Sequence, residues 1–320
     1  MPLVPVYAAG VALRAAGFLM GAEPKRRLQW PVISVGNLSA GGTGKTPFTI
    51  ALAELLIRQG LAVDVLSRGY GRQSSAVARV DPAGTAEEFG DEPLLIAREA
   101  GVPVYVGRRR YEAGLLAEGA SAVLGVQPGV HLLDDGFQHR QLKRDIDIVL
   151  VNSEDLADHP LPGGNLREPL SALRRATVFA VPEDDEAAIA RLRILGLTQP
   201  VWRFRREMAV PEVAGPVVAF CGIARPEQFF AGIERSGVAI AARRAFRDHH
   251  RFQTADLREL AEMVDRSGAQ ALLTTEKDRV RIGKLAEHLG RAPLLTVGLT
   301  VSFEDPVCVV KSVLEWLRQP

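Results

Sequence analysis

Cysteine is scarce in this chain of 320 residues, which contains only Cys221 and Cys308. The two residues do not form a C-x-x-C motif. Two isolated cysteines cannot build a disulfide framework, and they lack the spacing of a structural zinc site. The sequence therefore predicts a protein of a reducing compartment.

An excess of charge of one sign is also missing, because 39 basic and 38 acidic residues give a net charge of +1. A general nucleic-acid binder is usually strongly basic. Short basic clusters such as Arg108-Arg109-Arg110 do occur, and they can be either solvated faces or anion sites. We therefore predict no nucleic acid and no obligatory protein partner.

The sequence has no unbroken apolar run long enough to span a membrane. Residues 3–20 are mostly apolar, but Arg14 interrupts them and Lys25-Arg26-Arg27 follow them. A spanning helix needs about 20 apolar residues, and a secretory signal carries its positive charge before the apolar run. Two interpretations remain open: an amphipathic helix lying on a membrane surface, with its cations near lipid phosphates, or a helix packed on the protein itself.

The strongest motif that is present is a glycine-rich stretch at residues 32–47. It begins as a short apolar strand and leads into a helix from Phe48 to about Leu56. Such a loop binds phosphate oxygens through its backbone N–H groups and the start of the helix. The expected phosphate-binding residues are Ser39, Ala40, Gly41, Gly42, Thr43, Gly44, Lys45 and Thr46.

This stretch follows the P-loop pattern G-x-x-x-x-G-K-[ST], except that Ser39 replaces the first glycine. In a P-loop, Lys45 would reach the β- and γ-phosphates of ATP, and Thr46 would offer its hydroxyl to Mg²⁺. The alternative is a glycine-rich turn with an incidental lysine. The order of strand, glycines, lysine, threonine and helix favours the P-loop.

A second motif is the apolar run at residues 130–133, which ends in Asp134 and Asp135. A strand beside the P-loop strand that delivers a carboxylate to Mg²⁺ has this form. An aspartate pair can also simply form a turn. The P-loop upstream favours the metal-binding interpretation, with the choice between Asp134 and Asp135 left open.

Strands that alternate with helices predict an α/β fold with a mostly parallel sheet covered by helices on both faces. The pattern restarts near residue 200. We predict an N-terminal apolar or amphipathic helix at 1–28, a P-loop NTPase-like domain at 29–200 and a second, smaller α/β domain at 201–320. Expected strands include residues 61–66, 102–106, 145–151, 176–181, 216–221, 238–242, 271–275 and 294–297.

The sequence thus indicates an Mg²⁺-nucleotide enzyme, and transfer of a phosphoryl group to a hydroxyl requires a group that accepts the proton. Asp91 and Glu92 precede an expected helix, where they can either cap the helix or act as base and metal ligand. The other candidates are Asp134, Asp135 and His249. The residues alone leave the base undecided.

Together these motifs resemble those of the tetraacyldisaccharide 4′-kinases, the lipid A 4′-kinases of Gram-negative bacteria. The matching stretches cover nearly the full chain and keep the family's order: residues 35–38, 41–47, 67–72, 90–93, 134–139, 166–169, 222–223, 248–249 and 275–278. The resemblance implies transfer of the γ-phosphate of ATP to the 4′-hydroxyl of an acylated glucosamine disaccharide 1-phosphate. It also implies a peripheral protein on the cytoplasmic face of the inner membrane, with the membrane lipid surface as a partner.

The resemblance further assigns roles to individual residues. It implies that Asp91 is the general base and His249 its orienting partner, with Glu92 and Asp134 or Asp135 at the Mg²⁺ and Arg167 at the phosphates. Like charge from the phosphates and Glu92 is expected to raise the pKa of Asp91.

A different class of protein shares some of these features, namely the membrane-recruited P-loop switch ATPases of the partition and cell-division type. These proteins also combine a glycine-rich loop with a membrane helix. Their signature lysine precedes the two glycines, where this chain has Ala40. Whether ATP turnover requires the acylated disaccharide distinguishes the two functions.

Overall fold

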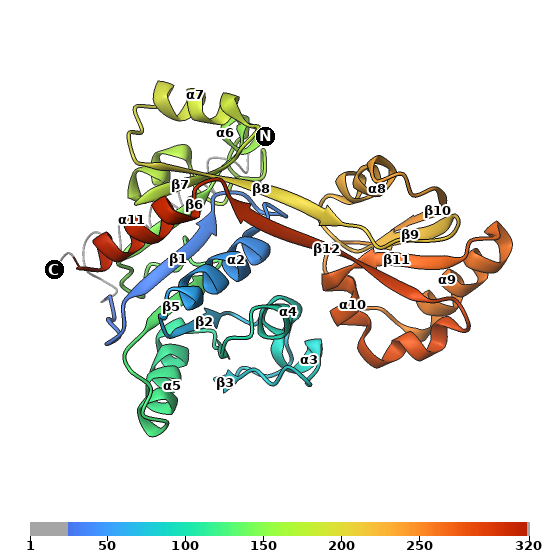
Figure 1. Cartoon of the computed structure of the whole chain (residues 1–320), viewed down its shortest axis with the longest axis horizontal. Helices are drawn as coiled ribbons and strands as arrows, with labels where there is room; N and C mark the ends of the chain where they lie inside the picture. Colours follow the sequence, from blue (N-terminus) through green and yellow to red (C-terminus); the bar gives the residue numbers. More distant parts are fainter. Residues whose placement is uncertain (1–24, 319–320) are drawn as a thin grey trace.

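The computed structural model describes residues 25–318. Figure 1 shows two lobes of unequal size, joined by two long strands. The strands are β1 (Val32–Asn37), β2 (Val63–Ser67), β3 (Ala78–Arg79), β4 (Val104–Val106), β5 (Val130–Asp134), β6 (Ile146–Leu150), β7 (Val178–Pro182), β8 (Val201–Ala209), β9 (Val217–Cys221), β10 (Ile240–Ala245), β11 (Ala271–Thr275) and β12 (Leu294–Phe303). The helices are α2 (Lys45–Arg58), α3 (Ala86–Phe89), α4 (Asp91–Glu99), α5 (Arg110–Val123), α6 (Ser153–Ala157), α7 (Glu186–Ile194), α8 (Pro226–Arg235), α9 (Thr254–Ser267), α10 (Glu276–Ile282) and α11 (Pro306–Arg318), with the 3-10 helices η1 (Leu170–Arg175) and η2 (Gly283–Leu289).

The sheet of the larger lobe is mostly parallel, with the strand order β7-β6-β1-β5-β2-β4 and the short antiparallel strand β3 at its edge. All six residues of β1 are buried, as expected for a strand covered on both faces. Ile33 and Val35 pack into the core under α2 and α4, and Val32 packs on the other face, against α5. The predicted α/β fold with a large, mostly parallel sheet is confirmed.

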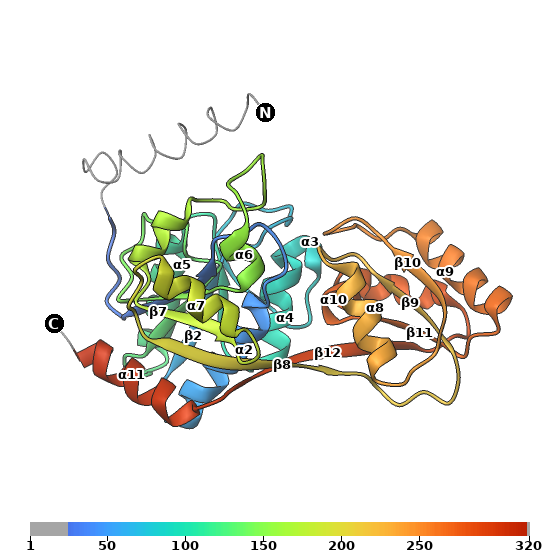
Figure 2. The same cartoon turned by 90° about the horizontal axis from the view of Figure 1, so that it is seen from above.

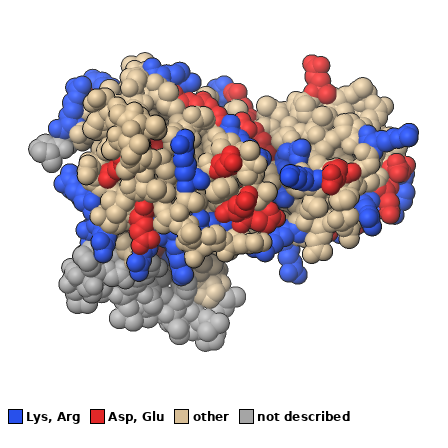
Figure 3. Space-filling model, turned by 90° about the horizontal axis from the view of Figure 1, so that it is seen from below, with Lys and Arg blue, Asp and Glu red and all other residues tan. Residues whose placement is uncertain are grey.

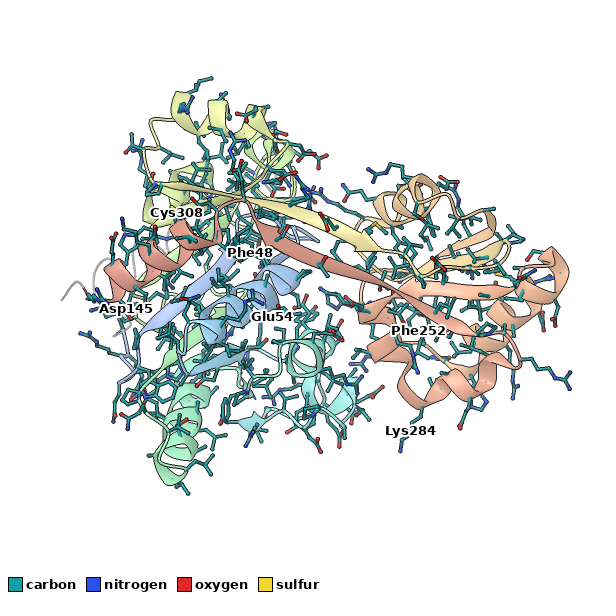
Figure 4. The ribbon with its side chains drawn as sticks, in the orientation of Figure 1. Phe48, Glu54, Asp145, Phe252, Lys284 and Cys308 are labelled. Carbon is teal, nitrogen blue, oxygen red and sulfur yellow. The ribbon has the colours of Figure 1, made fainter. Side chains whose placement is uncertain are left out.

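The smaller lobe has its own parallel strands, in the order β10-β9-β11-β12. Apolar clusters lie on both faces of these strands, one with α8 and the other with α9. Figure 4 labels Phe48 in the core of the larger lobe and Phe252 in that of the smaller lobe. Each lobe therefore has apolar clusters of its own.

The two lobes are joined by β8 and β12, which run antiparallel to each other (Figures 1 and 2). β8 pairs with β7 in the larger lobe, and β12 pairs with β11 in the smaller one. The pair of strands β8 and β12 therefore joins the sheets of the two lobes into one.

The C-terminal helix α11 returns to the larger lobe (Figure 2). Val309, Val310 and Val313 pack in the core that contains α2, and Trp316 stacks on Trp202 with ring centroids 5.7 Å apart. The division at residue 200 stays a prediction. Helix α11 follows residue 200 in the sequence, but it packs on the larger lobe.

The predicted N-terminal helix at 1–28 lies almost entirely outside the described residues. Within residues 25–318, no helix combines the length and the apolarity needed to cross a bilayer.

Candidate active site at the junction of the two lobes

The glycine-rich loop lies between the central strand β1 and helix α2, which begins at Lys45. Gly44 precedes the helix with a φ of 84°, in the left-handed region that favours glycine. A Cβ atom there would also approach the Arg206 side chain to 3.3 Å. No acidic residue lies in the first turn of α2 and no side chain caps it, so its first N–H groups remain available to an anion.

Asn37, the last residue of β1, holds this loop together. Its buried amide Nδ2 donates hydrogen bonds to Ser39 Oγ and Thr43 Oγ1, each at 2.9 Å. Its Oδ1 accepts a hydrogen bond of 3.0 Å from Lys45 Nζ. Our sequence analysis did not select Asn37, although a polar residue ending a buried strand was a usable signal.

The two predicted metal-binding aspartates have different environments. Asp135 has a φ of 48° and accepts hydrogen bonds of 2.8 and 3.0 Å from Arg167, with Lys45 Nζ at 3.6 Å. Burial opposes its ionisation, but the charges of Lys45 and Arg167 lower its pKa to about 2. Asp135 is therefore already ion-paired.

Asp134 is buried at the end of β5 and accepts a hydrogen bond of 3.3 Å from Thr49 Oγ1. Burial and the neighbouring charges of Glu92 and Asp135 raise its pKa to about 7. A divalent cation bound by Asp134 and Glu92 would offset this repulsion.

The loop that carries Arg167 is fastened to the glycine-rich loop by its backbone. Arg167 N–H donates to the carbonyl of Leu38 at 2.7 Å, and Ala40 N–H donates to that of Asn165 at 2.7 Å. The two loops thus form one surface, and Arg167 and Lys45 both lie beside Asp135.

The remaining predicted residues meet where α4 faces the smaller lobe. Asp91 Oδ2 lies 3.2 Å from His249 Nδ1, and Arg281 Nε donates a hydrogen bond of 2.7 Å to the same oxygen. The neighbouring His250 instead lies 2.9 Å from Asp256 Oδ2 and stacks on Phe246. The structure therefore brings His249, and not His250, to Asp91.

The expected direction of the Asp91 pKa is wrong for this arrangement. Burial would raise it, but the hydrogen bond with His249 and the charge of Arg281 outweigh burial and hold the pKa of Asp91 below its usual value. The hydrogen bond with Asp91 in turn raises the pKa of His249. In the described chain, Asp135 and His249 are the non-glycine residues with positive φ, so both strained residues belong to this site.

Helix α10 contributes two cations that our sequence analysis missed. Lys277 Nζ donates a hydrogen bond of 2.6 Å to Glu92 Oε1, and Arg281 binds Asp91. The sequence did contain one signal for them: Lys277 and Arg281 are four residues apart, so on a helix their side chains lie on the same face. Figure 3 shows acidic and basic side chains close together where the lobes meet.

The residues fit an Mg²⁺-nucleotide, although no three His, Cys, Asp or Glu side chains among residues 25–318 form a metal site by themselves. Mg²⁺ in nucleotide enzymes takes only one or two carboxylates, and substrate phosphates and water supply the rest. Glu92 and Asp134 are close enough to raise each other's cost of ionisation, and buried Thr46 starts the adjacent helix. This donor set suits one divalent cation.

Comparisons with known proteins agree with this geometry. A family model described as tetraacyldisaccharide-1-P 4′-kinase, LpxK, matches residues 1–318. The chain belongs to this family. It is 43% identical over 328 residues to the tetraacyldisaccharide 4′-kinase of Koribacter versatilis, covering 99% of this chain and 98% of the relative. The enzyme of that name from Desulfotalea psychrophila is 36% identical and covers 90% of this chain and 88% of the relative.

A solved structure gives the same result in three dimensions. The crystal structure of LpxK from Aquifex aeolicus in complex with ATP superposes with a TM-score of 0.74 and 31% sequence identity, covering 99% of this chain and 98% of that chain. The family predicted from the motifs is confirmed, and the switch ATPases are set aside.

Proposed function

We propose that the chain transfers the γ-phosphate of ATP to the 4′-hydroxyl of a tetraacylated glucosamine disaccharide 1-phosphate, in lipid A biosynthesis. One observation carries the mechanism: Asp91 of the larger lobe meets His249 of the smaller lobe, near the start of α2 at Lys45 and the end of β5 at Asp134. A hydroxyl acceptor needs a base at the phosphate site, and this contact supplies one.

The glycine-rich loop is proposed to act as a P-loop. Ser39 to Thr46 would present backbone N–H groups to the phosphates, with the start of α2 behind them. Asn37 holds the Lys45 ammonium on the loop, from where it would reach the β- and γ-phosphates. Arg167, fixed beside it by Asp135, would bind the same phosphates.

Thr46, Glu92 and Asp134 would hold Mg²⁺, with Asp135 completing the shell through water. When bound, Mg²⁺ neutralises charge on the phosphate oxygens. Because Asp135 is engaged by Arg167 and Lys45, Asp134 is the proposed direct ligand.

In the reaction, the 4′-oxygen forms a bond to the γ-phosphorus while the bond to the β,γ-bridging oxygen breaks and ADP leaves. Asp91 accepts the hydroxyl proton, and His249 orients the carboxylate. Asp91 is a weak base while Arg281 binds it, so Arg281 must release part of that contact when substrates bind. Lys45 and Arg167 stabilise charge on the leaving ADP.

An acylated disaccharide resides in a membrane, so we place the protein at the cytoplasmic face of the inner membrane as a peripheral protein. The apolar segment at 3–20 and the exposed Lys25, Arg26 and Arg27 support this location. We also propose that residues 29–200 act as the kinase domain and that the smaller domain closes over it.

The direct test incubates the full chain with ATP, Mg²⁺ and the disaccharide 1-phosphate, and identifies the product by mass. The expected product is heavier by one phosphoryl group at the 4′ position. ATP hydrolysis that is the same with and without the disaccharide, and no phosphorylated product, would contradict the proposal.

A further inference from the structure

Two cations of helix α10 contact the start of α4 in the other lobe. Lys277 and Arg281 are four residues apart and therefore share one face of the helix. They bind the adjacent carboxylates Glu92 and Asp91, respectively. The Lys277 and Glu92 side chains are only 27% and 24% exposed, so solvent screens this pair only in part.

Glu92 is in direct contact with Lys277 of the smaller lobe and also feels the charge of Lys45 in the larger lobe. Both charges lower its pKa. Both lysines likewise favour ionisation of Asp134. The space around these two carboxylates is therefore where cations from both lobes converge.

Glu92 cannot serve both Lys277 and a divalent cation with the same oxygen. If Glu92 turns to Mg²⁺, Lys277 becomes a partly buried ammonium that has lost its hydrogen-bond partner. An unpaired buried charge is costly, and the nearest new anion would be the phosphoryl group that is being transferred. A lysine ammonium on a flexible stem can make that move, because it is a point charge with several rotatable bonds.

We propose that Lys277 is a catalytic residue supplied by the smaller lobe: it neutralises Glu92 before substrates bind, and it contacts the transferring γ-phosphoryl group once Glu92 binds Mg²⁺. The inference rests on the proposed kinase function. Lys277 forms and breaks no covalent bond in this role. Its charge stabilises the oxygens of the phosphoryl group, as cations supplied from a second element do in other phosphoryl transfers.

The test uses three variants of the full chain. Lys277→Met removes the charge but keeps most of the stem, and Lys277→Arg keeps the charge. Lys284→Met is the matched control, because Lys284 belongs to the same lobe, is exposed and points away from the junction (Figure 4). Thermal unfolding confirms that each variant is folded.

Two quantities are measured for each variant. The first is kcat for the disaccharide at saturating ATP and Mg²⁺. The second is the affinity for Mn²⁺ alone, followed by electron paramagnetic resonance without nucleotide, which reports competition at Glu92.

We expect Lys277→Met to lower kcat on the order of 10²-fold and to bind Mn²⁺ on the order of 10-fold more tightly. Lys277→Arg should keep the wild-type Mn²⁺ affinity and recover part of the lost kcat, and Lys284→Met should match the wild type. A folded Lys277→Met protein with unchanged kcat, or with unchanged Mn²⁺ affinity, would overturn the proposal. A wild-type protein that phosphorylates no disaccharide would instead refute the proposed function, and the Mn²⁺ measurement would still report on the competition at Glu92.

Discussion

The Nε and Nη2 atoms of Arg281 both donate hydrogen bonds to Oδ2 of Asp91, across the junction of the two lobes. Nη1 of the same guanidinium donates to Asp278 and to the carbonyl of Gly222, so Arg281 is anchored in the smaller lobe. The proposed base is thus held by the lobe that also supplies His249. Movement between the lobes would change the basicity of Asp91.

Arg281→Met should move the acid limb of the pH profile of kcat/KM to higher pH. The Arg281 charge lowers the pKa of Asp91, so its removal raises that pKa toward or above the ordinary value of about 3.9. Because Asp91 must be deprotonated to act as a base, activity would then be lost at a higher pH as the solution is acidified. The control is Arg279→Met, since Arg279 lies on the same helix but binds the Gly283 carbonyl. If the acid limb of Arg281→Met stays at the wild-type pH, Arg281 does not lower the pKa of Asp91 in the active enzyme.

Lys45→Ala should lower turnover on the order of 10²-fold or more, because in the proposed mechanism it removes a fixed cation from the β- and γ-phosphates. Steady-state kinetics with ATP and the disaccharide measure this loss. The exposed Lys311→Ala on α11 is a charge-matched control and should keep its activity. A folded Lys45→Ala protein with near-normal turnover would contradict the P-loop assignment.

His131 should stabilise the fold most at mildly acidic pH, below its unfolded pKa of 6.5. Its buried ring lies 2.7 Å from Asp64 and 3.4 Å from Glu118, and it stacks on Trp30. Burial opposes the charge, but these carboxylates raise the pKa of His131 from 6.5 to about 9. A raised folded-state pKa gives stabilisation that is complete below the unfolded value and is lost as pH rises through about 9.

The measurement is the free energy of unfolding of the wild type and His131→Gln at pH 6 and above pH 9. At pH 6 the variant should lose about 3 kcal/mol, the cost of breaking a buried pair, and the difference should shrink at the higher pH. The exposed His159→Gln should show little change at either pH. A His131→Gln penalty that is independent of pH would mean that His131 is neutral in the folded protein.

Deletion of residues 1–20 should weaken binding to lipid vesicles while the nucleotide site remains intact. Vesicles with anionic lipid should bind better than neutral ones, given the three exposed cations at residues 25–27, and the preference should fade with salt. Sedimentation with vesicles measures both effects. Equal binding with and without the segment would show that it does not contact the membrane.

Much of the larger lobe could be predicted from the sequence, because its information is local. The apolar run of β1, the glycines after it and Lys45 all lie within residues 32–47. Parallel strands also bring their carboxyl ends to one edge, so the end of β1 and Asp134 were expected to be neighbours, and Val35 does pair with Asp134.

The connection between the lobes could not be predicted in the same way. β8 has charged residues among its apolar ones, and its second half is largely exposed, with β12 as its only strand partner there. Such a strand lacks the continuous apolar pattern that marked the others. The full length of β12 was missed for the same reason.

The ion pairs at the junction depend on tertiary structure alone. Lys277 and Glu92 are 185 residues apart in sequence, and Arg281 and Asp91 are 190 apart. The sequence shows neither contact, so the lowered pKa of Asp91 could not be foreseen. The pairing of Asp91 with His249 was expected only through the family resemblance.

The most direct test of the central claim is the kinetics of Asp91→Ala, His249→Ala and the double variant, with ATP and the acylated disaccharide 1-phosphate. Each single variant should lower kcat far more than it raises KM for ATP. The proposed mechanism makes the two residues a unit across the junction, so the double variant should be little worse than the poorer single variant. Unchanged kcat in either single variant, or losses that multiply fully in the double variant, would contradict the account.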